Sequence, residues 1–93
     1  MEQSPDPGPD LDLAQVRAFV AVADERHFGR AAARLGITQQ ALSKRVARLE
    51  STLGVRLFER GARGVGATAD GARFLEPARQ VLDAGRAAVD AVR

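Results

Sequence analysis

The segment of residues 30–50, RAAARLGITQQALSKRVARLE, constrains the fold most, because its pattern is typical of two helices joined by a tight turn. Gly36 is placed to end the first helix, since glycine readily adopts the left-handed conformation found after a helix C-terminus. Thr38 then serves as an N-cap, whose hydroxyl accepts a hydrogen bond from the first turn of the second helix. Apolar residues at helical spacing predict one buried stripe on that second helix: Leu42, Val46, Leu49 and Leu53.

The opposite face of the second helix carries amides, a hydroxyl and cations. Such groups read base edges when a helix lies in the major groove of DNA. The sequence therefore predicts a helix-turn-helix whose recognition surface is the outer face of residues 39–48. The expected base contacts are Gln39, Gln40, Ser43 and Lys44.

Charge is distributed unevenly along the chain, although the formal net charge is only +2. Residues 1–25 hold one arginine against six acids, whereas residues 26–63 hold nine lysines and arginines against two glutamates, a balance of +7. Residues 64–93 hold four charges of each sign. A segregated basic segment is the electrostatic footprint of a protein that binds a polyanion. On charge alone, a basic face that is merely solvated is an equal alternative.

Composition excludes several other classes of protein. A chain of 93 residues forms one small domain, and without cysteine it has neither disulfides nor thiolate metal sites. A single histidine does not build a metal cluster, and no apolar run approaches the roughly 20 residues of a membrane span. Ser43 has no histidine within its helix to activate it, so an enzyme is not expected. We expect a cytoplasmic protein without cofactor, metal, membrane partner or small-molecule ligand.

Two segments precede the helix-turn-helix. Residues 1–10, MEQSPDPGPD, are acidic and rich in proline and predict a disordered tail. A first helix is expected from about residue 13 to residue 25, with Asp10 or Asp12 near its cap. Its predicted buried stripe is Leu13, Val16, Phe19, Val20 and Ala23.

A short hairpin is predicted after the recognition helix. Gly54 supplies a helix stop, and the alternation in residues 55–60 favours a strand. Residues 61–66 then form a glycine-rich turn, and residues 67–68 return as a second strand. This hairpin is typical of a wing, which places Arg63 to enter a minor groove. An ordinary flexible hairpin is the simpler alternative. The turn is not followed by a lysine and a serine or threonine, so a nucleotide-binding loop is not expected.

Residues 68–93 predict a long C-terminal helix with Thr68 as its N-cap. Pro77 lies inside this helix, so a kink near residues 73–77 is expected. The apolar face is broad for so small a domain and favours packing against a partner helix. The predicted dimer interface comprises Phe74, Leu75, Ala78, Val81, Leu82, Gly85, Val89 and Val92.

Taken together, these residues resemble the N-terminal DNA-binding domain of LysR-type transcriptional regulators. The resemblance covers nearly everything after the tail, including FVAVA at residues 19–23, LGVRLFER at residues 53–60, and Thr68 with Gly71. It implies a mainly α fold: a winged helix-turn-helix at residues 11–67, made of three helices and a two-stranded wing, followed by a dimerising linker helix. It also implies the expected contacts with the DNA backbone, which are Arg30, Thr38, Arg48 and Arg60.

The chain departs from the family pattern at three positions. Gln40 stands where proline is usual, Lys44 where arginine is usual, and His27 where a serine caps the second helix. An amide at residue 40 reads adenine rather than contacting a thymine methyl group, which shifts sequence preference. A lysine keeps the charge but loses the bidentate geometry of arginine toward guanine.

The predicted function is sequence-specific binding of double-stranded DNA by a homodimer. The resemblance implies a DNA target that is an interrupted inverted repeat with an A·T-rich centre. It also implies an effector domain beyond this chain, and a full-length protein that is compatible with a tetramer. The alternative is a protein-interaction module that dimerises through residues 68–93 and carries a solvated basic face.

Overall fold

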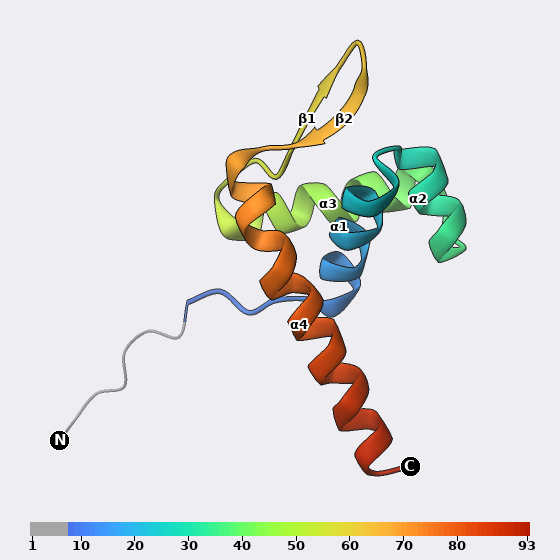
Figure 1. Ribbon diagram of the computed structural model, residues 1–93, viewed down its shortest axis with the longest axis vertical. Coiled ribbons are helices and arrows are strands. Elements are labelled where there is room, and N and C mark those ends of the chain that lie inside the picture. The colour runs from blue at the N-terminus through green and yellow to red at the C-terminus, as the bar shows by residue number, and fades with distance from the viewer. Residues whose placement is uncertain (1–7) are drawn as a thin grey trace, which may run out of the picture.

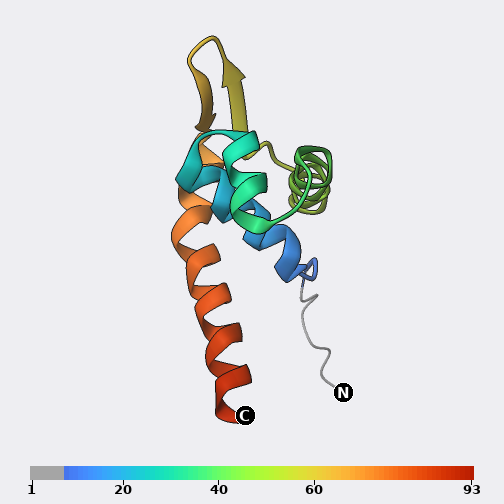
Figure 2. The same cartoon turned by 90° about the vertical axis from the view of Figure 1, so that its right-hand side faces the viewer.

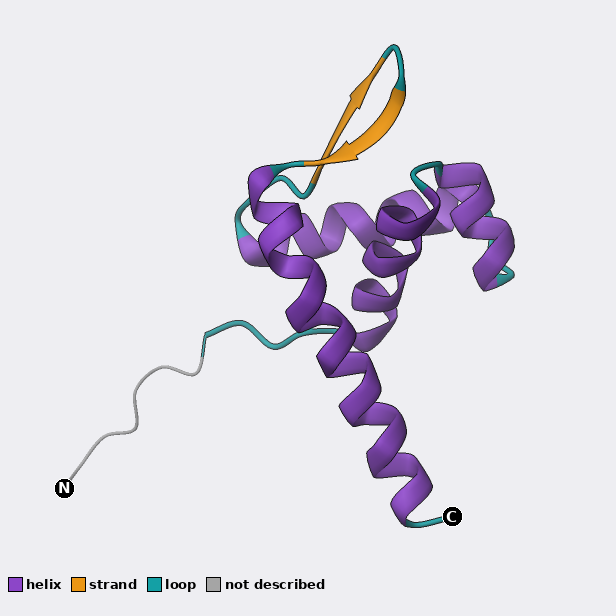
Figure 3. Ribbon diagram, in the orientation of Figure 1, coloured by secondary structure: helices purple, strands orange, loops and turns teal. Residues whose placement is uncertain are grey.

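The structure is a computed structural model that describes residues 8–93. This part of the chain forms four helices and one β-hairpin (Figure 1, Figure 3). The predicted mainly α fold with a two-stranded wing is confirmed. Most of the predicted disordered tail, residues 1–7, lies outside the described residues. The elements are α1 (Leu13–Glu25), α2 (Phe28–Leu35), α3 (Gln39–Leu53), β1 (Phe58–Gly61), β2 (Gly64–Ala67) and α4 (Ala69–Ala91).

Polar side chains cap the helices where the sequence places them. Asp12, Thr38 and Thr68 each accept a hydrogen bond from the backbone amide three residues on, at the starts of α1, α3 and α4. His27 caps α2 in the same way, because its Nδ1 accepts from the amide of Arg30 at 3.0 Å. The imidazole of His27 is therefore the N-cap of α2, the role that serine has at this position in the family pattern. Gly36 and Gly54 end α2 and α3 in the left-handed conformation, as predicted.

The core is organised around α1, which packs against α2, α3 and α4. The prediction for its buried stripe needs correction at Leu13, which is 41% exposed because it lies at the outer end of the helix. Ala18, Ala21 and Val22 are buried although the predicted stripe omitted them. A helix enclosed by three others buries most of its circumference, so one apolar stripe underestimates its core face.

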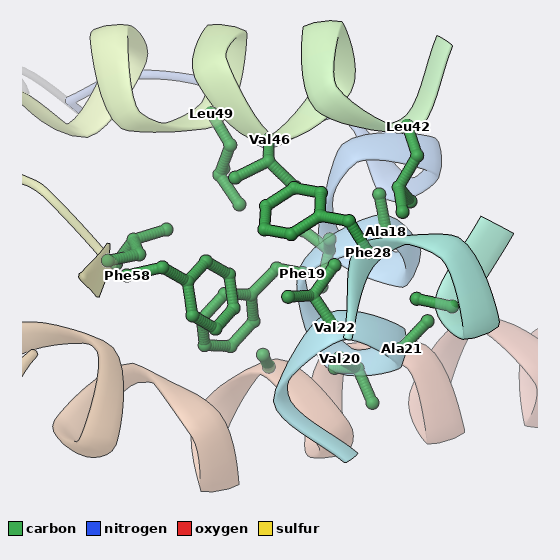
Figure 4. Close-up of a cluster of buried hydrophobic side chains, with 14 of the residues drawn as sticks. Ala18, Phe19, Val20, Ala21, Val22, Phe28, Leu42, Val46, Leu49 and Phe58 are labelled. Atoms are coloured by element: carbon green, nitrogen blue, oxygen red, sulfur yellow. The ribbon is translucent and has the colours of Figure 1, made fainter. Parts of the chain in front are cut away.

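Aromatic rings from α1, α2, β1 and α4 meet in the core. The ring centroid of Phe19 lies 5.2 Å from that of Phe58 on β1 and 5.1 Å from that of Phe74 on α4. Phe28, at the start of α2, meets Phe58 edge-on at 6.2 Å. Figure 4 shows the rings of Phe19, Phe28 and Phe58 beneath the apolar side chains of α3. The rings join the hairpin and α4 to the helix-turn-helix.

The hairpin begins later and turns more tightly than predicted. β1 starts at Phe58 rather than Val55, and the backbone amide of Leu57, just before it, donates to the Glu50 carboxylate instead of to a second strand. The amide of Phe58 donates to the same carboxylate. β2 starts at Gly64 rather than at residue 67, and the pair Gly61↔Gly64 closes the hairpin. Leu57 is fully buried, so the alternation seen in residues 55–60 comes partly from core packing.

The start of α4 is held tightly against the segment before the hairpin. The amide of Thr68 donates to the carbonyl of Leu57 at 3.0 Å, and its hydroxyl donates to the carbonyl of Arg56 at 2.6 Å. Gly71 lies so close that a Cβ on it would stand 2.1 Å from the carbonyl oxygen of Leu57. Only glycine fits here without displacing backbone.

Helix α4 is continuous across Pro77, so no break occurs there; the kink stays a prediction. Part of its apolar face packs on the chain's own core, which removes the fully buried Ala78 from the predicted dimer interface; the other interface residues stay a prediction. Ala78 is fully buried, and Phe74, Leu75 and Leu82 pack against the core of the same chain. The helix then runs past the start of α1 (Figure 1), and Val89 and Val92 near its C-terminus are exposed.

Asp24 joins three helices through two arginines. Its carboxylate, at the end of α1, accepts from Arg79 of α4 at 2.5 and 3.4 Å and from Arg34 of α2 at 3.0 Å. The hydrogen bond from Arg79 is the main reason that the pKa of Asp24 lies below its usual value, although partial burial opposes it. Asp24 lies near the C-terminus of α1, where the helix dipole disfavours a negative charge, and its tertiary contacts with the two arginines stabilise that charge.

We expect Gly71→Ala to destabilise the fold by about 1–3 kcal/mol, the usual range for overpacking, because its Cβ would clash with the carbonyl of Leu57. Gly85→Ala is the matched control, since a Cβ there meets only Leu13 Cδ1 at an ordinary 3.6 Å. Alanine at residue 85 should stabilise the helix by up to about 1 kcal/mol. Urea unfolding measures both, and equal effects of the two changes would contradict the packing described.

Because the Asp24 pKa is lower in the folded state, its ion pairs stabilise the fold above the unfolded pKa of about 3.9. That stabilisation is lost as the pH falls through the folded pKa. Asp24→Asn should cost about 1 kcal/mol at neutral pH, the upper range for partly exposed pairs, and progressively less in acid. Asp83→Asn is the control, because the pair of Asp83 with Arg86 is 71% exposed on both sides. Unfolding curves that show a constant difference at every pH would exclude this account.

Candidate nucleic-acid interface

The outer face of α3 lies on the far side of the molecule from α4. Helix α1 contacts both of them, and Figure 2 shows α3 end-on beyond α1, with the hairpin projecting above. Burial of Leu42, Val46 and Leu49 against α1 and α2 turns the other face of α3 outward. The face predicted to read bases is therefore presented to solvent beside the hairpin.

Three of the four predicted base-reading residues, Gln39, Gln40 and Lys44, are exposed, and Ser43 is half-buried. Arg48, one turn after Lys44, is exposed as well. Within residues 8–93, the side chains of these five residues make no hydrogen bond or ion pair. Their donors and acceptors are thus available to a ligand, which is what base-edge recognition requires.

The start of α2 lies against the start of α3. A Cβ built on Gly29 would stand 2.9 Å from Cε1 of His27 and 3.5 Å from Oε1 of Gln39. Glycine at residue 29 leaves room for the capping imidazole and the Gln39 amide on either side of it. Gly29 thereby shapes the edge of the recognition surface.

Arg63 occupies the tip of the hairpin, as predicted. The strands pair in antiparallel register and leave only Ala62 and Arg63 in the turn. Neither of these residues has positive φ; the left-handed conformation falls on Gly64, with φ of 104°. The tip carries an exposed guanidinium on a narrow projection (Figure 1).

Of the four predicted backbone contacts, Arg48 is exposed, and the other three contact neighbouring groups. Arg30 is 63% exposed and donates to the carbonyl of Glu25 at 3.2 Å, while its Nε lies 3.9 Å from the Glu25 carboxylate. The hydroxyl of Thr38 accepts from the amide of Ala41. The guanidinium of Arg60 lies over the ring of Phe28, with Cζ 4.1 Å from the ring centroid.

Several acids near this face are bound to other groups. Asp24 and Glu25 pair with arginines of α2 and α4. Glu50, on the inner flank of α3, accepts from the amides of Leu57 and Phe58 at 2.7 and 3.4 Å. The cations of α3 and of the hairpin tip therefore dominate the charge of the outer face.

Sequence reasoning missed the roles of Gly29, Phe28 and Glu50. A signal existed for Glu50, because it is one of only two acids in the basic segment 26–63 and it precedes a helix stop. No comparable signal marks Phe28, whose ring packs in the core and supports Arg60 at the same time.

Over the described range, 8–93, no helix is long and apolar enough to span a membrane. The same residues contain no group of three or more His, Cys, Asp or Glu side chains placed to hold a metal ion.

Comparison with known proteins places this arrangement in a family. Residues 13–72 match the family model described as bacterial regulatory helix-turn-helix protein, lysR family. Among curated relatives, the HTH-type transcriptional regulator TfdS of Cupriavidus pinatubonensis is 49% identical over 83 residues, which cover 89% of this chain and 28% of TfdS. The chain thus spans little more than a quarter of that relative.

Solved structures show the same fold. A mutant of Corynebacterium glutamicum OxyR superposes with a TM-score of 0.85 at 41% identity, over 89% of this chain and 27% of that one. The crystal structure of BenM_DBD in complex with catB site 1 DNA superposes with a TM-score of 0.83 at 38% identity, over 88% of this chain and 92% of that one.

Proposed function

Because this chain belongs to the LysR family of bacterial transcriptional regulators and carries their helix-turn-helix domain, we propose that it binds double-stranded DNA sequence-specifically as a homodimer. The observation that carries the proposal is the outer face of α3. Its amides and cations are exposed and unpaired within residues 8–93, and the arginine-tipped hairpin stands beside it. A wholly solvated face does not account for this concentration of base-reading groups on one helix.

In this proposal α3 enters the major groove with Gln39, Gln40, Ser43 and Lys44 toward the base edges. The two amides each offer the donor and acceptor pair that matches adenine, and Lys44 donates to guanine or to a phosphate. Arg63 enters the adjacent minor groove, where A·T-rich tracts attract arginine. Backbone phosphates are contacted by Arg30, Thr38, Arg48 and Arg60.

The dimer forms through the part of α4 that the chain's own core leaves uncovered. Val89 and Val92 are 47% and 86% exposed. By helical spacing they continue the apolar face of Val81 and Gly85, on the part of α4 that extends past the start of α1 (Figure 1). A hollow of about 830 Å³ beside this face, lined by apolar side chains such as Leu13 and Leu35 and by charged ones such as Arg17, has room for side chains of a second copy.

Two copies joined in this way present their recognition helices to successive major grooves, about 34 Å apart on one side of the duplex. The matching target is an interrupted inverted repeat whose A·T-rich centre suits the wings. We further propose a cytoplasmic protein without enzymatic activity, cofactor or small-molecule ligand in this part of the chain, and a tetramer where further domains follow.

The first test is the salt dependence of binding. Cations that neutralise phosphates release counterions, so log K should fall with log salt by about 0.9 per phosphate contacted. An electrophoretic titration of duplex DNA at several salt concentrations measures this slope. A flat response would favour the protein-interaction module with a solvated basic face.

Replacing Gln39 by alanine should reduce discrimination between the preferred sequence and a scrambled one by about 1–3 kcal/mol, because a bidentate contact with a base edge is lost. Sequences selected from a random duplex pool supply the preferred site. Gln80→Ala, an exposed glutamine on α4, is the matched control and should change neither affinity. Equal weakening on both duplexes would show that Gln39 does not read bases.

Val89→Glu should weaken dimerisation roughly 100-fold, about 3 kcal/mol, because each copy would have to remove a charged carboxylate from water in the apolar part of the interface. Ala87→Glu, which lies on the opposite side of α4 by helical geometry, should leave dimerisation unchanged. Sedimentation equilibrium of the free proteins measures both. A dimer that tolerates glutamate at residue 89 would place the interface elsewhere.

A further inference from the structure

Arg60 is not a freely mobile surface arginine. Its Cζ lies 4.1 Å from the ring centroid of Phe28, within the range of a cation–π contact. The ring is itself fixed, since Phe28 is only 7% exposed and meets Phe58 edge-on at 6.2 Å. A guanidinium that stacks by one face keeps its N–H edges free to donate.

The stacked guanidinium stands at the rim of a hollow between α3 and β1. The hollow measures about 200 Å³ and has an apolar floor formed by Phe28, Val46 and Phe58. Its polar rim includes Ser43 of the recognition face together with Arg56 and Arg60. Since a water molecule takes about 30 Å³, this space admits a phosphate group with ordered water.

One acid, Glu50, also lines the hollow. Its Oε2 accepts from the amides of Leu57 and Phe58 and lies 3.9 Å from Nε of Arg56. The carboxylate is therefore directed toward the backbone and balanced by one of the two arginines. The second arginine, Arg60, has no ion-pair partner within residues 8–93 and leaves the rim net positive.

We propose that this hollow seats one backbone phosphate of the bound duplex and that Phe28 positions Arg60 to hold it. The inference rests on the proposed function and adds to it a phosphate seat and a positioning residue. Ser43 belongs both to the base-reading face and to the rim. A DNA strand that leaves α3 for the wing therefore passes the hollow.

Stacking lowers the cost of phosphate binding because the guanidinium is already held in place. Cation–π contacts at exposed sites correspond to about a two- to fivefold effect on an equilibrium. Phe28 is thus expected to contribute to DNA affinity through Arg60, and only while Arg60 is present.

The test is a double-mutant cycle on the whole chain, with a labelled duplex of mixed sequence as the probe. Arg60→Gln should weaken binding and make the salt slope shallower by about 0.9, the loss of one phosphate contact. Phe28→Leu should weaken binding two- to fivefold when Arg60 is present and not at all in the Arg60→Gln background. Phe28→Tyr keeps the ring and should bind like the unchanged protein.

Two controls separate positioning from damage to the fold. Arg86→Gln removes an exposed cation on α4 and should leave the slope unchanged. Arg60→Lys keeps the charge and the whole core but loses the planar group, so it should weaken binding at an unchanged slope even if Phe28→Leu fails to fold.

Additive effects of the two changes, or normal binding by Arg60→Lys, would overturn the positioning role, and an unchanged slope in Arg60→Gln would overturn the phosphate seat. If the unchanged protein does not bind the duplex, the proposed function falls and this inference with it. If the unchanged protein binds the duplex but the effects of the Phe28 and Arg60 changes are additive, only this inference falls.

Discussion

The meeting of four phenylalanine rings is the interaction on which the rest of the structure depends. The chain has only four phenylalanines, and they come from α1, α2, β1 and α4. Each ring buries a large apolar area, and the tilted and edge-on contacts among them fix relative orientation as well as distance. Phe58 is the buried residue of β1, so the cluster is the main apolar attachment of the first strand, and Val65 of β2 packs against the same core. The cluster therefore decides where the wing stands relative to the recognition helix.

Polar contacts then stiffen the joints that the rings bring together. The Glu50 carboxylate ties the inner flank of α3 to the first residue of β1, and Thr68 ties the end of the hairpin to the segment before it. Asp24 joins α1 to α2 and α4 through arginines. All of these hydrogen bonds are directional, and those of the Glu50 and Asp24 carboxylates are also charge-assisted. They hold α3, the wing and α4 as one rigid unit, so that the outer face of α3 is prepared before any duplex arrives.

Local signals in the sequence predicted the helices well, because caps and stops act within a few residues. Thr38, Gly36, Gly54 and Thr68 all serve as predicted. Features set by distant contacts were predicted poorly. The strand begins only at residue 58, because the amide of Leu57 before it donates to Glu50, and Ala78 is buried because α1 lies beside it. The outer face of α3 could be predicted because it consists of the residues outside the buried apolar stripe. The stacking of Arg60 on Phe28 could not, because it depends on β1 and α2 meeting in space.

The division of α4 into a covered and an uncovered half has a consequence for the proposed dimer. Ala78 and the pair of Arg79 with Asp24 fix the first half of the helix to α1, while the second half runs beyond the core. A continuous helix transmits orientation along its length because each turn is hydrogen-bonded to the next. The angle between two α4 helices in a dimer therefore sets the separation of the two α3 helices. In this arrangement the spacing of DNA half-sites is determined far from the bases, by the apolar face around Val89.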